Sequence, residues 1–396
     1  MRPIRSTTLT VLASALMATT LTGCEFTSEP QDTSEIVIAA DLELSGAAAS
    51  TGKAYQRALE LKVEQINESG GLGGRKIRLA VKDNRSDPAE SLRNIGDFTN
   101  DATVSAIIMG GCNECAIGAA NTVNDKKVPT IALAPATKVA NPVAERRYMF
   151  KLAPNANDSA AALAAELKRK NVKKVALLHT DDDYGTESSV LLEGELDKAD
   201  IKLSRQKTIK ATDTDVNQAV KSLVDGPKVD ALVIWTPAEQ AMLAANAATS
   251  SKFSGQLFFD ASAAGDLFLG GDGKSRATDD ATMVFTQTMV IDDVIATTPA
   301  KASRKQWFRA YTARYGGYYG FSSFAADAVQ LIVDSVLRAK GTAGALNRDG
   351  IRDVLETSQL EGLSGPIRMT PDNHSGLMPQ ALTTLVARGG RWRLAG

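Results

Sequence analysis

The chain has 396 residues, of which 43% are hydrophobic and 23% charged, and its 45 Lys and Arg nearly balance its 46 Asp and Glu. This composition is typical of a folded globular protein with more than one domain, and the even charge excludes a nucleic-acid-binding protein that neutralises phosphates with a basic surface. Only 2 His and 3 Cys are present, so we expect neither a metal site nor a cofactor.

The first 23 residues have the features of a signal peptide. Arg2 and Arg5 give a positive start, and the uncharged stretch 9–21 is too short and too rich in threonine to span a bilayer. The segment ends in Leu-Thr-Gly-Cys at 21–24, which resembles a bacterial lipobox and implies cleavage before Cys24 and lipidation of that residue. An ordinary secretory signal with a chance cysteine is the alternative. We therefore expect an extracytoplasmic protein that is lipid-anchored to the bacterial membrane.

Residues 24–35 are polar and without periodicity, which predicts a flexible tether. From residue 36, short apolar strands alternate with amphipathic helices. The sequence Asp87-Pro88-Ala89-Glu90 predicts a helix start with an N-cap, a proline in the first turn and the glutamate of a capping box. The glycine-rich run 70–74 predicts the turn that ends the first helix. The strands predicted in this first half are 36–40, 77–81, 104–109 and 128–133.

The same alternation continues from residue 172. Predicted strands are 172–178, 201–207, 229–235 and 256–259, and predicted helices are 186–199, 213–224 and 238–248. Continuous apolar strands are typical of parallel sheets buried on both faces, so the pattern predicts an α/β protein with two Rossmann-like open sheets. Residues 300–358 are predicted to be mostly helical, at 307–315, 324–339 and 348–357. Short strands at 366–369 and 381–387 are predicted to complete the second lobe.

Seven short motifs stand in order along this body. They are Leu44-Ser45-Gly46, Ile66-Asn67-Glu68-Ser69-Gly70-Gly71, Asp83 with Ser86-Asp87-Pro88, Ala134-Pro135-Ala136-Thr137, Asp181-Asp182-Asp183-Tyr184-Gly185, Tyr311 with Arg314-Tyr315-Gly316, and Gly362-Leu363-Ser364-Gly365-Pro366. In this order and spacing, the chain resembles the extracellular solute-binding proteins of branched-chain amino-acid-type (Leu/Ile/Val-binding) ABC importers, which have the type I periplasmic-binding fold.

The resemblance implies two lobes that close on a small ligand, joined by hinge strands crossing near 151–154, 285–289 and 366–370. It assigns 36–153 plus 287–366 to the N-terminal lobe, and 154–286 plus 367–396 to the C-terminal lobe. It further implies a monomer, not an enzyme, that captures an amino acid or related polar compound and delivers it to an ABC transporter permease. A ligand-sensing receptor of the same fold is the alternative function.

Three residues match ligand-contact positions of the family. The resemblance implies that Thr137 holds the ligand's carboxylate, that the carbonyl of Pro135 receives its ammonium group, and that Tyr184 lines the cleft from the second lobe. The alternatives are that Thr137 only caps a helix and that Tyr184 is a half-buried packing residue.

Several positions depart from the family pattern. Thr51 stands where the family has a tyrosine. The serine that usually meets the carboxylate falls at Asn113 or Glu114, and the acidic partner of the ammonium falls at Ser262, two residues after Asp260. A carboxylate ligand would be repelled by Glu114 in a partly dehydrated cleft. We therefore hypothesise a ligand whose cationic or donor end faces Glu114, or one that is not an α-amino acid. A solvated residue in the first turn of a helix is the alternative for Glu114.

The remaining candidates also have two interpretations. Trp235 ends an apolar strand and is expected either in the cleft wall or in the core. The acidic run 181–183 lacks the glycine and bidentate glutamate of a calcium loop and is expected to be solvated.

Cys112 and Cys115 are separated by two residues, which fits a redox motif, a metal site or a local disulfide. Outside the cytoplasm a disulfide is expected, and it would stiffen a loop near the ligand. The sequence has no Gly-x-Ser-x-Gly, His-Glu-x-x-His or P-loop motif, which favours a binding protein over these enzyme classes.

Overall fold

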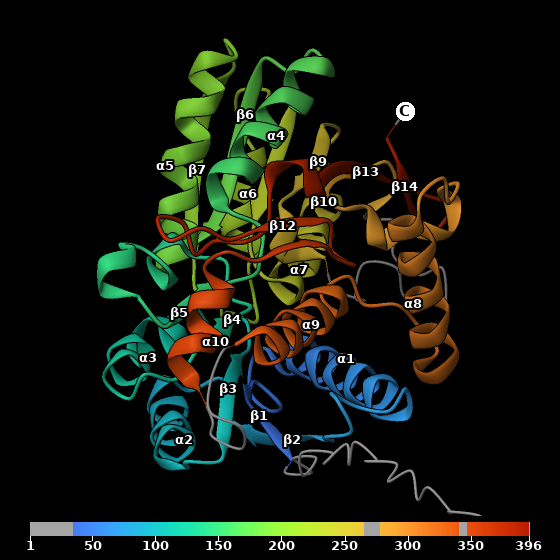
Figure 1. Cartoon of the computed structure of the whole chain (residues 1–396). Coiled ribbons are helices and arrows are strands. Elements are labelled where there is room, and N and C mark those ends of the chain that lie inside the picture. The colour runs from blue at the N-terminus through green and yellow to red at the C-terminus, as the bar shows by residue number, and fades with distance from the viewer. Residues whose placement is uncertain (1–34, 265–277, 340–346, 396) are drawn as a thin grey trace, which may run out of the picture.

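The computed structural model describes residues 35–264, 278–339 and 347–395, and the signal-peptide, Cys24 and tether predictions fall outside these ranges. Figure 1 shows two layered α/β units, one above the other. The first contains a five-stranded parallel sheet in the order β2-β1-β3-β4-β5. Its strands are β1 (Ile36–Leu42), β2 (Ile77–Asp83), β3 (Val104–Met109), β4 (Thr130–Ala132) and β5 (Met149–Lys151).

Helices cover the first sheet on both faces. They are α1 (Ala49–Glu68), α2 (Pro88–Asn100) and α3 (Asn113–Asp125), joined later in the chain by α9 (Ser322–Arg338) and α10 (Arg348–Leu355). Helix α9 packs along α1, and α8 (Pro299–Tyr315) is tied to α1 by the Tyr315 hydroxyl, which donates to the carbonyl of Arg57 at 3.1 Å. The C-terminal helices therefore return to the first unit, and they contribute to its core.

The second unit is built on a seven-stranded sheet in the order β14-β13-β10-β9-β8-β6-β7, in which only β13 runs opposite to the other strands and pairs antiparallel with both of its neighbours. Its strands are β6 (Lys174–Thr180), β7 (Lys202–Ile209), β8 (Ala231–Trp235), β9 (Gln256–Phe259), β10 (Thr282–Thr286), β13 (Leu382–Arg388) and β14 (Arg391–Leu394). Its helices are α4 (Ala156–Arg169), α5 (Asp183–Lys198), α6 (Asn217–Val224) and α7 (Ala238–Ser250). The prediction of two open, mainly parallel sheets is confirmed.

Short 3-10 helices occupy several of the connections. They are η1 (Thr137–Val139), η2 (Val143–Glu145), η3 (Ala261–Ala263), η6 (Gln287–Asp293) and η7 (Pro379–Ala381). The chain passes from the first unit to the second after β5, returns after β10 and enters the second again between β12 (Pro366–Arg368) and β13. Three chain segments therefore link the two sheets.

Some predicted elements are corrected by the structure. Strand β12 pairs with β11 (Gln359–Glu361) in a separate two-stranded ribbon, so it does not join the second sheet. Helix α5 begins at Asp183, three residues before the predicted start, because the Asp182 side chain accepts the Gly185 amide and caps it there. The cap of α2 is partly as predicted: Asp87 accepts the amides of Ala89 and Glu90, but the Glu90 side chain pairs with Arg93 and does not complete a capping box.

Candidate functional site

A cavity of about 440 Å³ lies between the two units. Its walls come from segments that follow β1, β3 and β4 of the first sheet and β6, β7, β8 and β9 of the second, so the carboxyl ends of both parallel sheets face it. This is where open α/β sheets place ligands. Part of the wall is aromatic: Tyr55 and Phe321 line it with their ring centroids 6.2 Å apart, together with Phe324.

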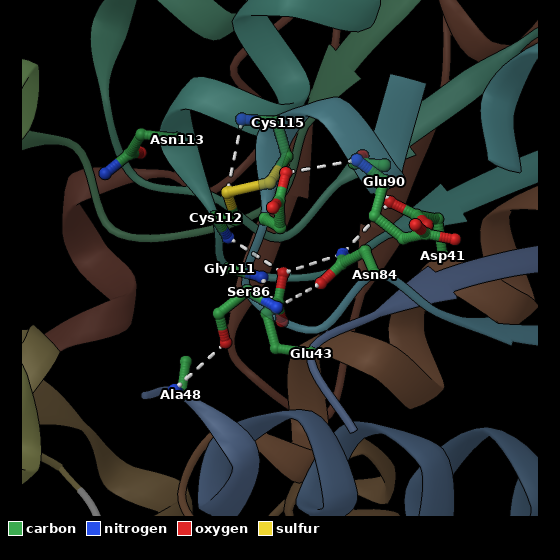
Figure 2. The surroundings of a disulfide bond; sticks show 12 residues. Asp41, Glu43, Ala48, Asn84, Ser86, Glu90, Gly111, Cys112, Asn113 and Cys115 are labelled. Carbon is green, nitrogen blue, oxygen red and sulfur yellow. Dashed lines mark hydrogen bonds between the residues drawn. A yellow bond between two sulfur atoms is a disulfide. The ribbon is translucent and has the colours of Figure 1, made fainter. Parts of the chain in front are cut away.

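Glu43, which follows β1, is the most buried carboxylate in the cavity wall, with 1% exposure. Its carboxylate accepts the backbone N–H groups of Gly111 and Cys112, each at 3.1 Å, at the turn between β3 and α3 (Figure 2). A Cβ at Gly110 would lie 2.1 Å from Glu43 Oε2, so the glycine permits this close approach. Burial raises the pKa of Glu43, while the two amides act against that shift.

Behind Glu43 lies a second buried carboxylate, Asp41 (Figure 2). Asn84 joins the two, because its Nδ2 donates to Asp41 at 3.0 Å and to Glu43 at 3.4 Å. Asp41 also accepts from Ser91 at 2.5 Å and from Asn94 at 2.8 Å. Burial raises the pKa of Asp41, and these donors oppose the shift. This network holds the floor of the first-unit side of the site in one arrangement.

The Cys112 and Cys115 sulfur atoms are bonded at 1.98 Å at the start of α3, and Cys112 lines the cavity. Between them, Asn113 accepts the Ala136 amide at 2.9 Å, and its Nδ2 lies 3.5 Å from Asp182 of the second unit. Glu114 also lines the cavity, and its pKa is raised by partial burial and by the carboxylates of residues 181–183. The first turn of α3 therefore reaches across the cleft.

The positions expected to hold the charges of an amino acid are occupied by the protein's own groups. Lys151, which has no solvent exposure, donates from Nζ to the Pro135 carbonyl at 3.0 Å. The Thr137 amide donates to Glu187 of α5 at 3.1 Å. Pro135 lines the cavity, whereas Thr137 is not among the lining residues.

The second-unit wall contains a buried hydroxyl–carboxylate cluster. The Tyr184 hydroxyl donates to Asp260 at 3.0 Å, and Ser262 donates to Asp260 from its amide at 3.0 Å and from its hydroxyl at 2.7 Å. Burial raises the pKa of Asp260 to about 7. Tyr184 and Ser262 line the cavity, but Asp260 lies behind them. Trp235, 1% exposed, packs against Tyr184 with ring centroids 6.0 Å apart. Of the two places expected for Trp235, the cleft wall and the core, it therefore lies in the core.

The structure thus brings six of the nine expected site residues to one cavity and leaves three outside its wall. The six are Thr51, Asn113, Glu114, Pro135, Tyr184 and Ser262, and the three are Thr137, Trp235 and Asp260. Lining residues beyond the nine expected ones include Glu43, Tyr55, Lys210, Glu239, Gln240 and Phe321. The sequence offers one indication of Glu43, because it is a charged residue that directly follows a buried strand.

Among the described residues, four contacts near the cavity run from one unit to the other. Ser50 of α1 donates to Glu239 of α7 at 2.5 Å, and Lys138 pairs with Asp183 at 2.6 Å. The Asn113–Asp182 and Thr137–Glu187 contacts described above complete the set. These contacts hold the two units together around the cavity.

Within the described ranges, no group of three or more His, Cys, Asp or Glu side chains is arranged to hold a metal ion. No helix in that same part of the chain has the length and apolar character needed to cross a membrane. Both histidines are engaged in packing: His179 contacts the Thr180 carbonyl at 2.9 Å, and His374 stacks on Phe150 with ring centroids 4.2 Å apart.

Two α/β units that enclose a cavity at their strand ends have the architecture of a two-lobed ligand-binding protein. The model of the periplasmic binding protein family matches residues 35–390, and the chain belongs to that family. The family places it among solute-binding proteins of the ABC-transporter type, which act in the periplasm or outside the cell.

Known proteins resemble this chain to different degrees. An amino acid binding protein from Pseudomonas aeruginosa is 26% identical over 194 residues, 48% of this chain and 50% of that protein, so the chain matches only half the length of this relative. A crystal structure of an extracellular ligand-binding receptor from Rhodopseudomonas palustris HaA2 superposes with a TM-score of 0.82 at 23% identity, covering 91% of this chain and 99% of the other. The branched-chain amino acid transporter substrate-binding protein LivJ from Streptococcus pneumoniae, in complex with isoleucine, gives a TM-score of 0.77 at 23% identity, covering 90% and 97%. At these identities the two structures show the fold alone.

Proposed function

We propose that this chain is the substrate-binding component of an ABC uptake system, which captures a small polar solute related to the amino acids and delivers it to a membrane permease. The observation that carries the proposal is the cavity of about 440 Å³ whose walls come from the strand ends of both sheets. A cavity shared by two lobes changes shape when the lobes separate, so ligand capture and lobe closure are coupled. A permease that contacts both lobes can then distinguish the loaded from the empty protein.

The three segments that link the two sheets serve as the hinge in this proposal. They are 151–154, 285–289 and 366–370, and they divide the chain into an N-terminal lobe of 36–153 plus 287–366 and a C-terminal lobe of 154–286 plus 367–396. Lys151 supports this assignment, because its amide donates to the His374 carbonyl at 2.9 Å and its carbonyl accepts the Gly376 amide at 2.9 Å. The first linking segment is therefore bonded to residues 374–376, which follow the third segment, and this contact ties the two crossings to each other.

Membrane attachment is part of the same proposal. Residues 1–23 would be removed as a signal peptide, and lipid on Cys24 would anchor the domain through the tether that ends at residue 35. The domain would act as a monomer, with its cleft free to meet solute and permease. In the native host, Cys24→Ala is expected to release the protein from the membrane fraction without altering its fold, whereas unchanged fractionation would contradict the lipid anchor.

The test of the function is identification of the solute and of its fate. The full chain is purified in detergent without added ligand, denatured, and the released small molecules are identified by mass spectrometry. Uptake of the identified compound is then measured in the host with and without this protein. Loss of uptake in its absence supports transport. A bound compound whose uptake is unchanged contradicts transport and supports a sensing receptor instead.

A further inference from the structure

Two backbone amides at the cavity wall that could bind a ligand carboxylate are already occupied by the protein. The N–H groups of Gly111 and Cys112 stand at the N-terminal end of the 13-residue helix α3, where free amides and the helix dipole favour an anion. Glu43 occupies both at 3.1 Å. A carboxylate on the ligand would have to compete with Glu43 for these two amides and would face that carboxylate at close range.

Charge in the cavity wall is strongly one-sided. The ionisable lining residues include five carboxylates and one amine: Glu43, Glu114, Asp181, Asp182, Glu239 and Lys210. They come from both units, since Glu43 and Glu114 belong to the first and the other four to the second. A positively charged ligand would therefore meet compensating charge from each side of the cleft, whereas an anion would meet repulsion from both.

An unsatisfied acceptor gives an independent indication of what the cavity binds. Gln240, 6% exposed, lines the cavity, and its Nε2 donates to the Asp213 carbonyl at 3.2 Å. Its Oε1 is buried and has no hydrogen-bond partner. A buried acceptor without a donor raises the free energy of the folded protein. A ligand with an N–H or O–H group at this position would supply the missing donor.

Aromatic rings lie beside Glu43. Tyr55 is close enough for the charge of Glu43 to contribute to the raised pKa of the phenol, and a Cβ at Gly111 would lie 3.8 Å from the Tyr55 ring. Phe321 packs edge-on against Tyr55 and completes this wall. A carboxylate next to aromatic faces suits an ammonium or guanidinium group with an apolar body, because the ring quadrupole and the carboxylate both attract the cation.

We propose that the cleft selects a small organic cation, a primary amine, diamine or guanidine that carries no carboxylate, with its charged end on Glu43 and a second donor near Gln240 and Glu239. The inference rests on the proposed solute-binding function and names its ligand class. The proposed ligand differs from isoleucine, the ligand in the S. pneumoniae structure, because it has no carboxylate. In this chain the carboxylate of Glu43 already accepts the amides of Gly111 and Cys112 at the start of α3.

The test compares compounds that differ only by a carboxylate. Binding of the full chain in detergent is measured by calorimetry for the pairs agmatine and arginine, cadaverine and lysine, putrescine and ornithine, isoamylamine and leucine, and phenethylamine and phenylalanine. We expect at least one amine to bind at least about tenfold more tightly than its amino acid, since a charge-assisted contact contributes roughly that factor. Any amino acid that binds more tightly than its amine overturns the inference and leaves the solute-binding function intact. Absence of binding by both members of every pair, together with no compound released from the purified protein, overturns the function as well.

Variants assign the binding to these carboxylates. Glu43→Gln is expected to lower the affinity for the tightest-binding amine at least about tenfold. Glu114→Gln, at a partly exposed position that tolerates change, is expected to lower that affinity severalfold. Lys210→Met is expected to tighten amine binding, because it removes a positive charge from the cavity wall. Glu193→Gln, on the exposed side of α5 and outside the cavity wall, is the matched control and is expected to leave the affinity unchanged. Unchanged amine affinity in both Glu43→Gln and Glu114→Gln overturns the assignment, and circular dichroism melting verifies that each variant is folded.

Discussion

Lys151 donates a hydrogen bond from Nζ to the carbonyl oxygen of Pro135 at 3.0 Å, and its side chain has no solvent exposure. Burial lowers the pKa of this lysine to about 7, and the nearby carboxylates of Glu187 and Asp158 oppose that shift only in part. The contact fixes the cavity wall at Pro135 to the end of β5, where the chain leaves the first sheet. A buried amine at this point makes the stability of the fold depend on pH.

The sign of that dependence follows from the lowered pKa. Between about 7 and the ordinary value of 10.5, the unfolded chain keeps the Lys151 proton that the folded chain releases. The unfolding free energy of the wild type should therefore rise with pH across this range relative to Lys151→Met, by up to about 1.4 kcal/mol per pH unit, and the difference should be constant below it. Urea unfolding of both proteins from about pH 6 to about pH 9 measures this. Lys53→Met, at an exposed position of α1, is the control, and a flat difference for Lys151→Met would contradict the prediction.

The second prediction concerns Tyr184, whose hydroxyl donates a hydrogen bond to the buried carboxylate of Asp260 at 3.0 Å. Tyr184→Phe should lower the unfolding free energy by about 1–3 kcal/mol, since Asp260 loses a donor in the interior. Ligand affinity should change by less than about threefold, because the ring that lines the cavity remains. Urea unfolding and calorimetry measure the two effects separately. Tyr315→Phe, which removes a hydroxyl bonded to the Arg57 carbonyl away from the cavity wall, is the control for affinity and should leave it unchanged. A large loss of affinity at unchanged stability in Tyr184→Phe would place the Tyr184 hydroxyl on the ligand.

Much of the fold could be predicted from the sequence, because strands buried on both faces leave an uninterrupted apolar run. The strands at 104–109 and 256–259 were predicted with the bounds that the structure has. Strand β10 was indicated only by the hinge crossing expected near 285–289, since threonines stand at both of its ends and its antiparallel partner β13 lies about a hundred residues later. The three-residue β5 was likewise indicated only by the hinge crossing expected near 151–154, because a run that short has no measurable periodicity.

The candidate site was less predictable, because its chemistry depends on contacts between distant residues. Family-like motifs indicated the correct loops, and six expected residues do line the cavity. However, nothing local in the sequence indicates that Glu43 reaches the amides of Gly111 and Cys112, or that Glu187 reaches the Thr137 amide from another lobe. Glu114 favours a cationic ligand from the sequence alone, and the structure places a second, more deeply buried carboxylate, Glu43, in the same cavity wall.

The bond between Cys112 and Cys115 leads to a prediction about both stability and the site. Replacing both cysteines with serine should lower the unfolding free energy by roughly 2 kcal/mol, the chain-entropy value for so short a loop. Amine affinity should also fall, because Glu43 is held by the amides of this same turn. Urea unfolding and calorimetry measure these losses. Alkylation of the unreduced wild-type protein is the companion measurement, and two reactive thiols at 112 and 115 would contradict the premise.

The contact between Ser50 and Glu239 makes the last prediction, which concerns closure of the cleft. Ser50 lies at the start of α1 and Glu239 at the start of α7, so their 2.5 Å hydrogen bond exists only when the two units approach each other. Ser50→Ala should cost the closed form about 1 kcal/mol, which shifts the balance toward open molecules by roughly fivefold. Small-angle X-ray scattering should then give a larger radius of gyration for the ligand-free variant than for the wild type. With saturating ligand the two values should converge, because ligand contacts from both sides replace the lost bond.

Ser189→Ala, which removes a hydroxyl bonded only within α5, is the matched control. Equal radii for Ser50→Ala and wild type without ligand would mean that this contact has no part in closing the cleft.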